Sequence, residues 1–215
     1  MEKLIDKLRE FEKNINGVTN ETELQSMFEK LAPAFLYGGY IKVRNDYKVY
    51  IRTVEFYFHS ENKNGIHDPI VYHRNGRDLE KVPYFPFMCL HAHSSGFDIA
   101  FESESEGFRA SALIRSFEIK NNKGKYLVWD KNLSMFTDSE KYEKNTQSTY
   151  LYILLNGFAL GNHNDITWED DPRDSRKVSS KTRQNVFQSK SELEYKPIKG
   201  KKCERKWSFT REEGV

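Results

Sequence analysis

The clearest hydrophobic pattern in the chain lies between residues 48 and 59, KVYIRTVEFYFH, where β-branched and aromatic residues are concentrated. A run of this kind is typical of a β-strand, whose successive side chains point to opposite faces. Regular alternation places Val49, Ile51, Glu55 and Tyr57 on the same face. The sequence therefore predicts a strand that carries one carboxylate, that of Glu55, on a largely apolar face.

A second strand is predicted between residues 108 and 120, FRASALIRSFEIK, and its centre contains one cation, Arg115. Two interpretations of Glu55 follow. If Glu55 pairs with a cation such as Arg115, it is structural; if it is desolvated and its pKa is raised, it serves as a base. The second interpretation requires that Arg115 orients Glu55 and leaves one carboxylate oxygen free.

Two amphipathic helices are predicted before these strands. The first covers residues 2 to 14, with apolar residues at helical spacing at Leu4, Ile5, Leu8, Phe11 and Ile15. The second starts near Thr19 and ends at Gly38, with an apolar stripe at Leu24, Met27, Phe28 and Leu31. A short strand at residues 40 to 44 then forms a hairpin with the Glu55 strand.

Beyond the Glu55 strand, several glycines and prolines predict a long loop that ends before residue 90. Residues 90 to 101, LHAHSSGFDIAF, read as a strand with a bulge at Gly96, and residues 149 to 160 fit a short buried helix. The expected fold class is α+β, with a curved, mainly antiparallel sheet and surrounding helices. The strands of Glu55 and Arg115 are expected in that one sheet.

Composition supports a single domain. A chain of 215 residues is long enough for one substantial core, and no Ser/Gly/Pro-rich linker divides it. The 15 Phe and 12 Tyr predict a core built largely from aromatic side chains. We expect one domain over residues 1–215, with a helical N-terminal part at residues 1–32 and a basic C-terminal part at residues 171–215.

Charge is unevenly distributed, although the formal net charge is only +2. Residues 171–215 contain 13 Lys and Arg against 7 Asp and Glu. Such a segment either follows a phosphate backbone or is a solvated, partly disordered tail. No apolar run reaches the roughly 18 residues of a membrane span, and Cys89 and Cys203 form no C-x-x-C motif. We expect a soluble, cytoplasmic monomer without a membrane partner.

Histidines offer a possible metal site. His91 and His93 alternate onto one strand face, and Asp98 or Glu102 would add a carboxylate ligand. The competing interpretation is that the two histidines are polar residues on a half-exposed strand. The chain has no glycine-rich phosphate loop and no G-x-S-x-G motif.

Several segments occur in the order found in the alkyladenine (3-methyladenine) DNA glycosylase family, which the chain resembles over residues 31–119. LAPAFLYGGYIKV at residues 31–43 resembles that family's helix-to-strand junction, and TVEFY at residues 53–57 resembles its V-E-x-Y motif. DPIVYHRNGR at residues 68–77 is similar to its D-P-x-x-H-x-x-G-R loop, with one extra residue. EGFRASALIRSFEI resembles the strand that ends in LLRALEP, so Arg115 and Glu118 match the family's Arg and Glu.

The resemblance implies excision of a damaged, alkylated purine that is flipped out of DNA. In this scheme Glu55 activates the water that hydrolyses the N-glycosidic bond, Arg115 holds the Glu55 carboxylate, and Tyr57 stacks on the base. DNA is the implied partner, and neither a cofactor nor a metal is needed. Further candidates for substrate binding are His67, His73, His91 and His93.

The chain also departs from the family. Ser95, within HAHSSG, stands where the family has a tyrosine that wedges into DNA, and Ala100 stands where it has an asparagine at the base pocket. Three functions stay open. A monofunctional DNA glycosylase needs an open pocket at Glu55, a non-catalytic nucleic-acid or protein-binding module on the same fold does not, and a metal-dependent enzyme would use His91 and His93.

Overall fold

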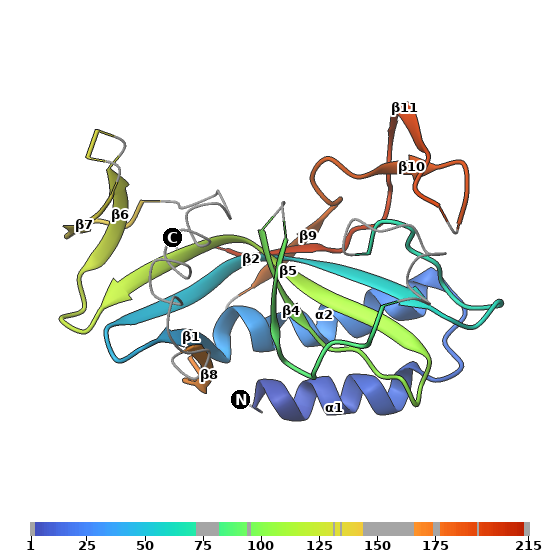
Figure 1. The fold of residues 1–215 in the computed structure, drawn as a ribbon, viewed down its shortest axis with the longest axis horizontal. Coiled ribbons are helices and arrows are strands. Elements are labelled where there is room, and N and C mark those ends of the chain that lie inside the picture. Colours follow the sequence, from blue (N-terminus) through green and yellow to red (C-terminus); the bar gives the residue numbers. More distant parts are fainter. Residues whose placement is uncertain are drawn as a thin grey trace.

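The computed structural model describes residues 3–71, 82–93, 96–130, 132–133, 135–143, 166–173, 177–192 and 194–212. Two helices pack against one face of a curved, mainly antiparallel sheet (Figure 1). The predicted α+β fold class is confirmed. The predicted buried helix at residues 149–160 lies outside the described residues.

Helices α1 (Leu4–Ile15) and α2 (Glu21–Tyr37) occupy the positions predicted for them. Helix α1 buries one stripe, Leu4, Leu8, Phe11 and Ile15. Helix α2 starts one residue later than the Thr19 signal suggested, because Asn20 is the N-cap and its side chain accepts a hydrogen bond from the Glu23 amide at 2.8 Å. Neither of the helices found among the described residues is long and apolar enough to cross a membrane.

The strands are β1 (Gly39–Val43), β2 (Tyr47–Ser60), β3 (Leu90–His93), β4 (Gly96–Ala100), β5 (Phe108–Asn121), β6 (Tyr126–Asp130), β7 (Met135–Ser139), β8 (Ile166–Asp170), β9 (Val178–Lys181), β10 (Phe187–Ser189), β11 (Pro197–Lys202) and β12 (Ser208–Arg211). The main sheet has the order β3-β4-β5-β2-β1-β8. Strand β12 pairs with β2 and β9, while β6 and β7 extend from β5. Strands β10 and β11 form a separate hairpin. The strands of Glu55 and Arg115, β2 and β5, are therefore neighbours in one sheet, as predicted.

The segment predicted as one bulged strand at residues 90–101 is instead a hairpin. Strands β3 and β4 are antiparallel, with His93 opposite Gly96. Gly96 has a φ of 139°, a conformation that glycine adopts more readily than other residues. The expected bulge is wrong because the glycine marks a reversal of the chain.

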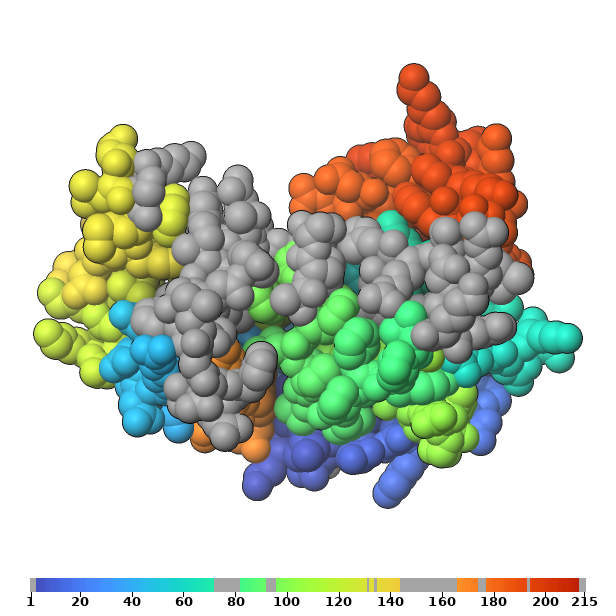
Figure 2. Space-filling model, in the orientation of Figure 1, coloured from blue at the N-terminus to red at the C-terminus, as the bar shows by residue number. Residues whose placement is uncertain are grey.

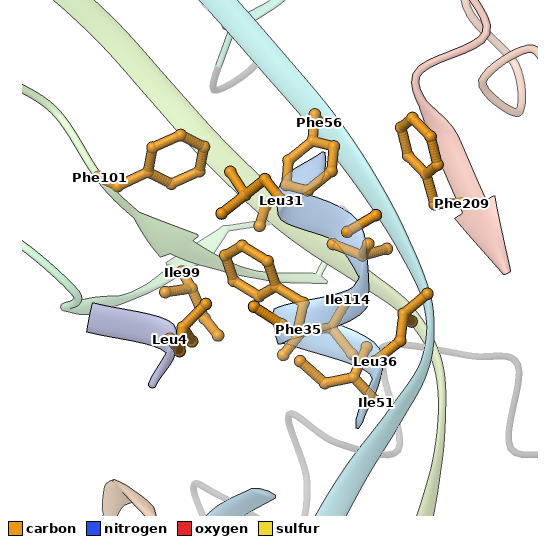
Figure 3. Close-up of a cluster of buried hydrophobic side chains, with 14 of the residues drawn as sticks. Leu4, Leu31, Phe35, Leu36, Ile51, Phe56, Ile99, Phe101, Ile114 and Phe209 are labelled. Carbon is orange, nitrogen blue, oxygen red and sulfur yellow. The ribbon is translucent and has the colours of Figure 1, made fainter. Parts of the chain in front are cut away.

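The core between the helices and the sheet is aromatic, as the composition predicted. The Phe56 ring lies 4.6 Å from that of Phe28 and 5.5 Å from those of Phe35 and Phe209. Figure 3 shows Phe35, Phe56, Phe101 and Phe209 around this point, which joins α2, β2, β12 and the residue that follows β4. Edge-to-face and offset ring pairs of this kind add to the stability gained from burial.

The C-terminal part contributes to that core. Trp207 and Phe209 are each only 1% exposed, and β12 pairs with the middle of β2, with Ser208 opposite Glu55. The interpretation of this part as a solvated, disordered tail is therefore wrong for β12, while β9 is paired with β12 but mostly exposed. The β6–β7 and β10–β11 hairpins project from the sheet on the side away from the helices (Figures 1 and 2).

Candidate functional site

The candidate site lies next to two irregularities in the pairing of the central strands β2 and β5, where the alternation of side chains between the two faces of the sheet is interrupted. The pairing of β2 with β5 shifts register twice between residues 51 and 54, so that neither Arg52 nor Arg115 has a residue directly opposite. Such β-bulges re-aim the side chains that follow them. Before the bulge Val49 and Ile51 face the core under the helices, and after it the core residues are Val54, Phe56 and Phe58.

The predicted neighbours of Glu55 are therefore wrong. Val49 and Ile51 lie on the opposite face of the sheet from Glu55, because the bulge reverses the alternation between them. Tyr57 does share the face of Glu55, and it belongs to a second, smaller apolar cluster with Val186. Simple alternation could not place these residues correctly, since no residue in the run marks a bulge.

Glu55 is held by three hydrogen bonds. Its Oε2 accepts from Arg115 Nε at 2.7 Å and from the Tyr57 hydroxyl at 3.2 Å, and its Oε1 accepts from the Gln184 amide at 2.8 Å. Arg115 also donates to the Gln184 carbonyl at 3.4 Å. Residues from β2, β5 and the turn after β9 thus meet at one carboxylate.

Burial and neighbouring charges shift the pKa values of Tyr57 and Arg115. Glu55 is 1% exposed, whereas the Arg115 side chain is 22% exposed. Burial and the Glu55 charge raise the pKa of Tyr57 well above its ordinary value, so its hydroxyl stays protonated and donates. Burial lowers the pKa of Arg115, but Glu55 and Tyr57 together raise it by more, so the pKa of Arg115 lies above its ordinary value.

A second buried ion pair lies beside the first. Arg183 forms a salt bridge with Asp68, and neither side chain is more than 2% exposed. The Arg183 guanidinium lies 4.6 Å from the centre of the Tyr57 ring and 4.9 Å from that of Trp207. Arg183 therefore covers Tyr57 while its neighbour Gln184 binds Glu55. Cation–π contacts with desolvated arginines stabilise such an arrangement.

A cavity of about 740 Å³ opens between the start of α2 and the β10–β11 hairpin. Its wall includes Arg183, Val186, Tyr195, Cys203 and Trp207. Neither Glu55 nor Tyr57 lines this cavity. Arg183 and Val186 lie between the cavity and the Glu55 group, because both line the cavity, Arg183 contacts the Tyr57 ring and Val186 belongs to the same apolar cluster as Tyr57.

The predicted histidines do not gather at Glu55. His67 lines the cavity, where its Nε2 lies 2.9 Å from the Asn62 carbonyl and its ring stacks on His59 at 5.2 Å. His91 lies on β3, with its ring 4.2 Å from that of Phe85. His93 is in β3, but its side chain, like the whole of His73, lies outside the described residues.

The possible metal site needs His93, whose side chain lies outside the described residues. In the described part of the chain, no group of three His, Cys, Asp or Glu side chains is arranged to hold a metal ion. Asp98 lies opposite His91 in the β3–β4 hairpin, while Glu102 instead accepts from the Phe85 amide at 2.7 Å and contacts Arg109 at 3.5 Å.

Sequence reasoning missed Arg183, Gln184 and the role of Asp68. Asp68 begins the DPIVYHRNGR segment, so its position in that segment was a usable signal. Arg183 and Gln184 gave none, because a basic segment far along the chain does not reveal that β12 returns to the centre of the sheet. No protein-family model, curated protein or solved structure matches the chain.

Proposed function

We propose that the protein excises damaged, alkylated purines from DNA, with Glu55 as the general base. One observation carries the proposal. Three residues that the glycosylase resemblance assigns to one active site share a single oxygen atom, since Arg115 and Tyr57 both donate to Glu55 Oε2 at 2.7 and 3.2 Å. Arg115 is 60 positions from Glu55 in the chain, so this meeting is not a local consequence of sequence.

The chemistry follows from the charges. A water molecule attacks C1′ of the sugar and gives its proton to the ionised Glu55 carboxylate, while the purine leaves with the electrons of the N-glycosidic bond. Arg115 orients the Glu55 carboxylate through its hydrogen bond to Oε2. Tyr57 is protonated at neutral pH and donates to Glu55 Oε2, which also accepts from Arg115. Oε1 is then the oxygen that accepts the proton of the attacking water.

The reaction requires one local opening. Oε1 accepts from the Gln184 amide at 2.8 Å, and Glu55 is 1% exposed. Withdrawal of the turn at residues 183–186 would connect Glu55 and Tyr57 to the cavity, because Arg183 and Val186 line both. A flipped base would enter from that side, which agrees with an extra-helical substrate.

A second candidate is a non-catalytic nucleic-acid-binding module on this fold. The observation that favours it is that Glu55 is closed off from the cavity. Both of its carboxylate oxygens are hydrogen-bonded, and the cavity does not reach them. A buried carboxylate with this set of donors is also what a purely structural ion pair requires. The basic C-terminal part would then supply the contacts to phosphates.

Glu55→Gln separates the two candidates because it keeps the shape of the side chain and removes the proton acceptor. If Glu55 is the base, release of alkylated purine from methylated DNA falls by about 10²- to 10⁴-fold while the melting temperature changes little. If Glu55 is structural, the variant loses on the order of 3 kcal/mol of unfolding free energy, because a buried guanidinium loses its partner. The wild-type protein then releases no base.

Glu102→Gln is the matched control. Glu102 is also buried and paired with an arginine, Arg109, at 3.5 Å, but it lies outside the Glu55 group. Its loss should lower stability without a specific effect on base release at a temperature where the variant is folded. Equal loss of activity in both variants would contradict the proposal.

A further inference from the structure

Three arginines surround one carboxylate on the face of the sheet away from the helices. Glu118 lies in β5, and its oxygens are 2.6 Å from Arg52 Nη1, 3.1 Å from Arg211 Nη2 and 3.9 Å from Arg173 Nη1. The Glu118 side chain is 5% exposed. One buried negative charge thus faces three positive charges, which leaves this group of residues, the Glu118 cluster, with an excess of positive charge.

Lysines enlarge this positive region. Lys120 lies 4.6 Å from the centre of the Tyr126 ring, and Lys48 lies 4.7 Å from that of Tyr40. The pKa of Lys48 is raised by Tyr50 and, to a smaller extent, by Tyr40 and the Asp171 carboxylate. Lys120 also lies 6.0 Å from the centre of the Tyr50 ring, which Arg173 contacts at 4.1 Å, so positively charged side chains gather around this ring.

Arg173 has unused hydrogen-bonding capacity. Its guanidinium lies 4.1 Å from the centre of the Tyr50 ring and its main-chain amide donates to the Tyr37 carbonyl at 2.9 Å, so the residue is held in place. Within the described part of the chain, its Nε and Nη2 are nevertheless buried without a hydrogen-bond partner. Buried donors of this kind are costly unless a partner binds them. The Arg173 side chain as a whole is 31% exposed, so a ligand can contact it from solvent, although these two donor atoms are themselves buried.

The electrostatics of Arg211 agree with an excess of positive charge. Burial lowers the pKa of Arg211, and the charges of Arg52 and Arg173 lower it further against the opposing effect of Glu118. An anion that enters the cluster would relieve this repulsion. Guanidinium groups are suited to phosphate oxygens because their paired N–H groups match them in geometry.

We infer that the Glu118 cluster binds a phosphodiester group of a nucleic-acid strand, with Arg173 as the main donor. This inference rests on the proposed function for its choice of nucleic acid as the partner. Arg52 and Glu55 are three residues apart on β2, a separation of about 10 Å along a strand. That distance corresponds to roughly three nucleotide steps along duplex DNA, so the Glu118 cluster and the Glu55 group are close enough to contact one strand.

The test is the salt dependence of binding to a fluorescent single-stranded oligonucleotide, measured by anisotropy. Arg173→Gln should weaken binding and reduce the slope of log Kd against log salt by about 0.7, the value for one phosphate contact on a single strand. Arg173→Lys should keep most of the slope but bind more weakly, because a lysine cannot donate two parallel hydrogen bonds. The melting temperature of both variants reports whether they remain folded.

Arg9→Gln is the matched control. Arg9 also combines an ion pair, with Glu12 at 2.7 Å, and a contact with an aromatic ring, that of Phe87 at 3.9 Å, but it is on α1 on the other side of the sheet. This substitution should leave the salt slope unchanged.

The outcomes separate this inference from the glycosylase proposal. A wild-type slope in Arg173→Gln, or equal effects of Arg173→Gln and Arg9→Gln, overturns the inference even if base release is observed. A reduced slope in Arg173→Gln together with no base release by the wild-type protein supports the inference and counts against the proposed catalysis. Absence of oligonucleotide binding by the wild-type protein overturns the inference.

Discussion

At the scale of single residues, His59 provides a test that does not depend on any ligand. Its side chain is buried on the face of Glu55 and Tyr57, and no described residue forms a hydrogen bond with its Nδ1. Burial, and then the neighbouring His67, lower the pKa of His59 to about 4 from its ordinary value of 6.5. The folded protein therefore binds a proton here less readily than the unfolded chain does.

The sign of the pH effect follows. At pH values above the pKa of His59 in the unfolded chain, His59 is neutral in both the folded and the unfolded state and does not affect stability. As pH falls from about 6.5 towards 4, only the unfolded chain gains a proton, which stabilises the unfolded state. This residue alone should cost about 2 kcal/mol of unfolding free energy between about pH 7.5 and pH 5. Urea titrations at the two pH values should show that His59→Asn loses less stability on acidification than the wild-type protein. An unchanged difference between the two pH values would contradict the assignment.

At the scale of the elements, the double bulge explains where prediction from sequence succeeded and where it failed. The two central strands and their pairing were predictable, because long β-branched and aromatic runs are strong signals. Whether Glu55 and Val49 lie on the same face of the sheet was not predictable, since a single unpaired residue in β2 reverses the faces on which the following side chains lie. The bulges instead bring Arg52 to Glu118 and Arg115 to Glu55, two ion pairs of which only the second was anticipated.

The pairing across β2 and β5 makes Glu118 important for stability. Glu118→Gln removes the negative charge that offsets the repulsion among Arg52, Arg173 and Arg211. We expect a loss of about 3 kcal/mol of unfolding free energy, as for a broken buried pair, measured by urea denaturation at low ionic strength. Added salt should recover part of the loss, because the repulsion between the partly exposed arginines is screened. A variant as stable as the wild-type protein would show that the three arginines do not repel one another appreciably.

At the scale of the whole molecule, the C-terminal part is a structural component of the domain. A chain that ends at residue 176 lacks β9 and β12, and with them Trp207 and Phe209, each 1% exposed. Losing one large buried aromatic residue costs about 3 to 5 kcal/mol, and the total stability of a domain is only about 5 to 15 kcal/mol. The truncated chain should show no cooperative thermal transition by circular dichroism. Removal of residues 213–215 alone is the control, and a cooperative transition in the longer truncation would contradict this prediction.

The return of β12 to the middle of β2 has a consequence for the order of events during synthesis. Glu55 and Gln184 are separated by 129 positions, so a ribosome completes α2, β2 and β5 long before it makes the residues that close over Glu55. At a synthesis rate of roughly 5 to 20 residues per second, these early segments exist for several seconds before the C-terminal residues are made. During that interval the edge of β2 that later receives β12 is open to other strands, including those of a neighbouring nascent chain. Slower translation of the C-terminal part would lengthen this exposure, and the yield of folded protein should then depend on how fast that part is made.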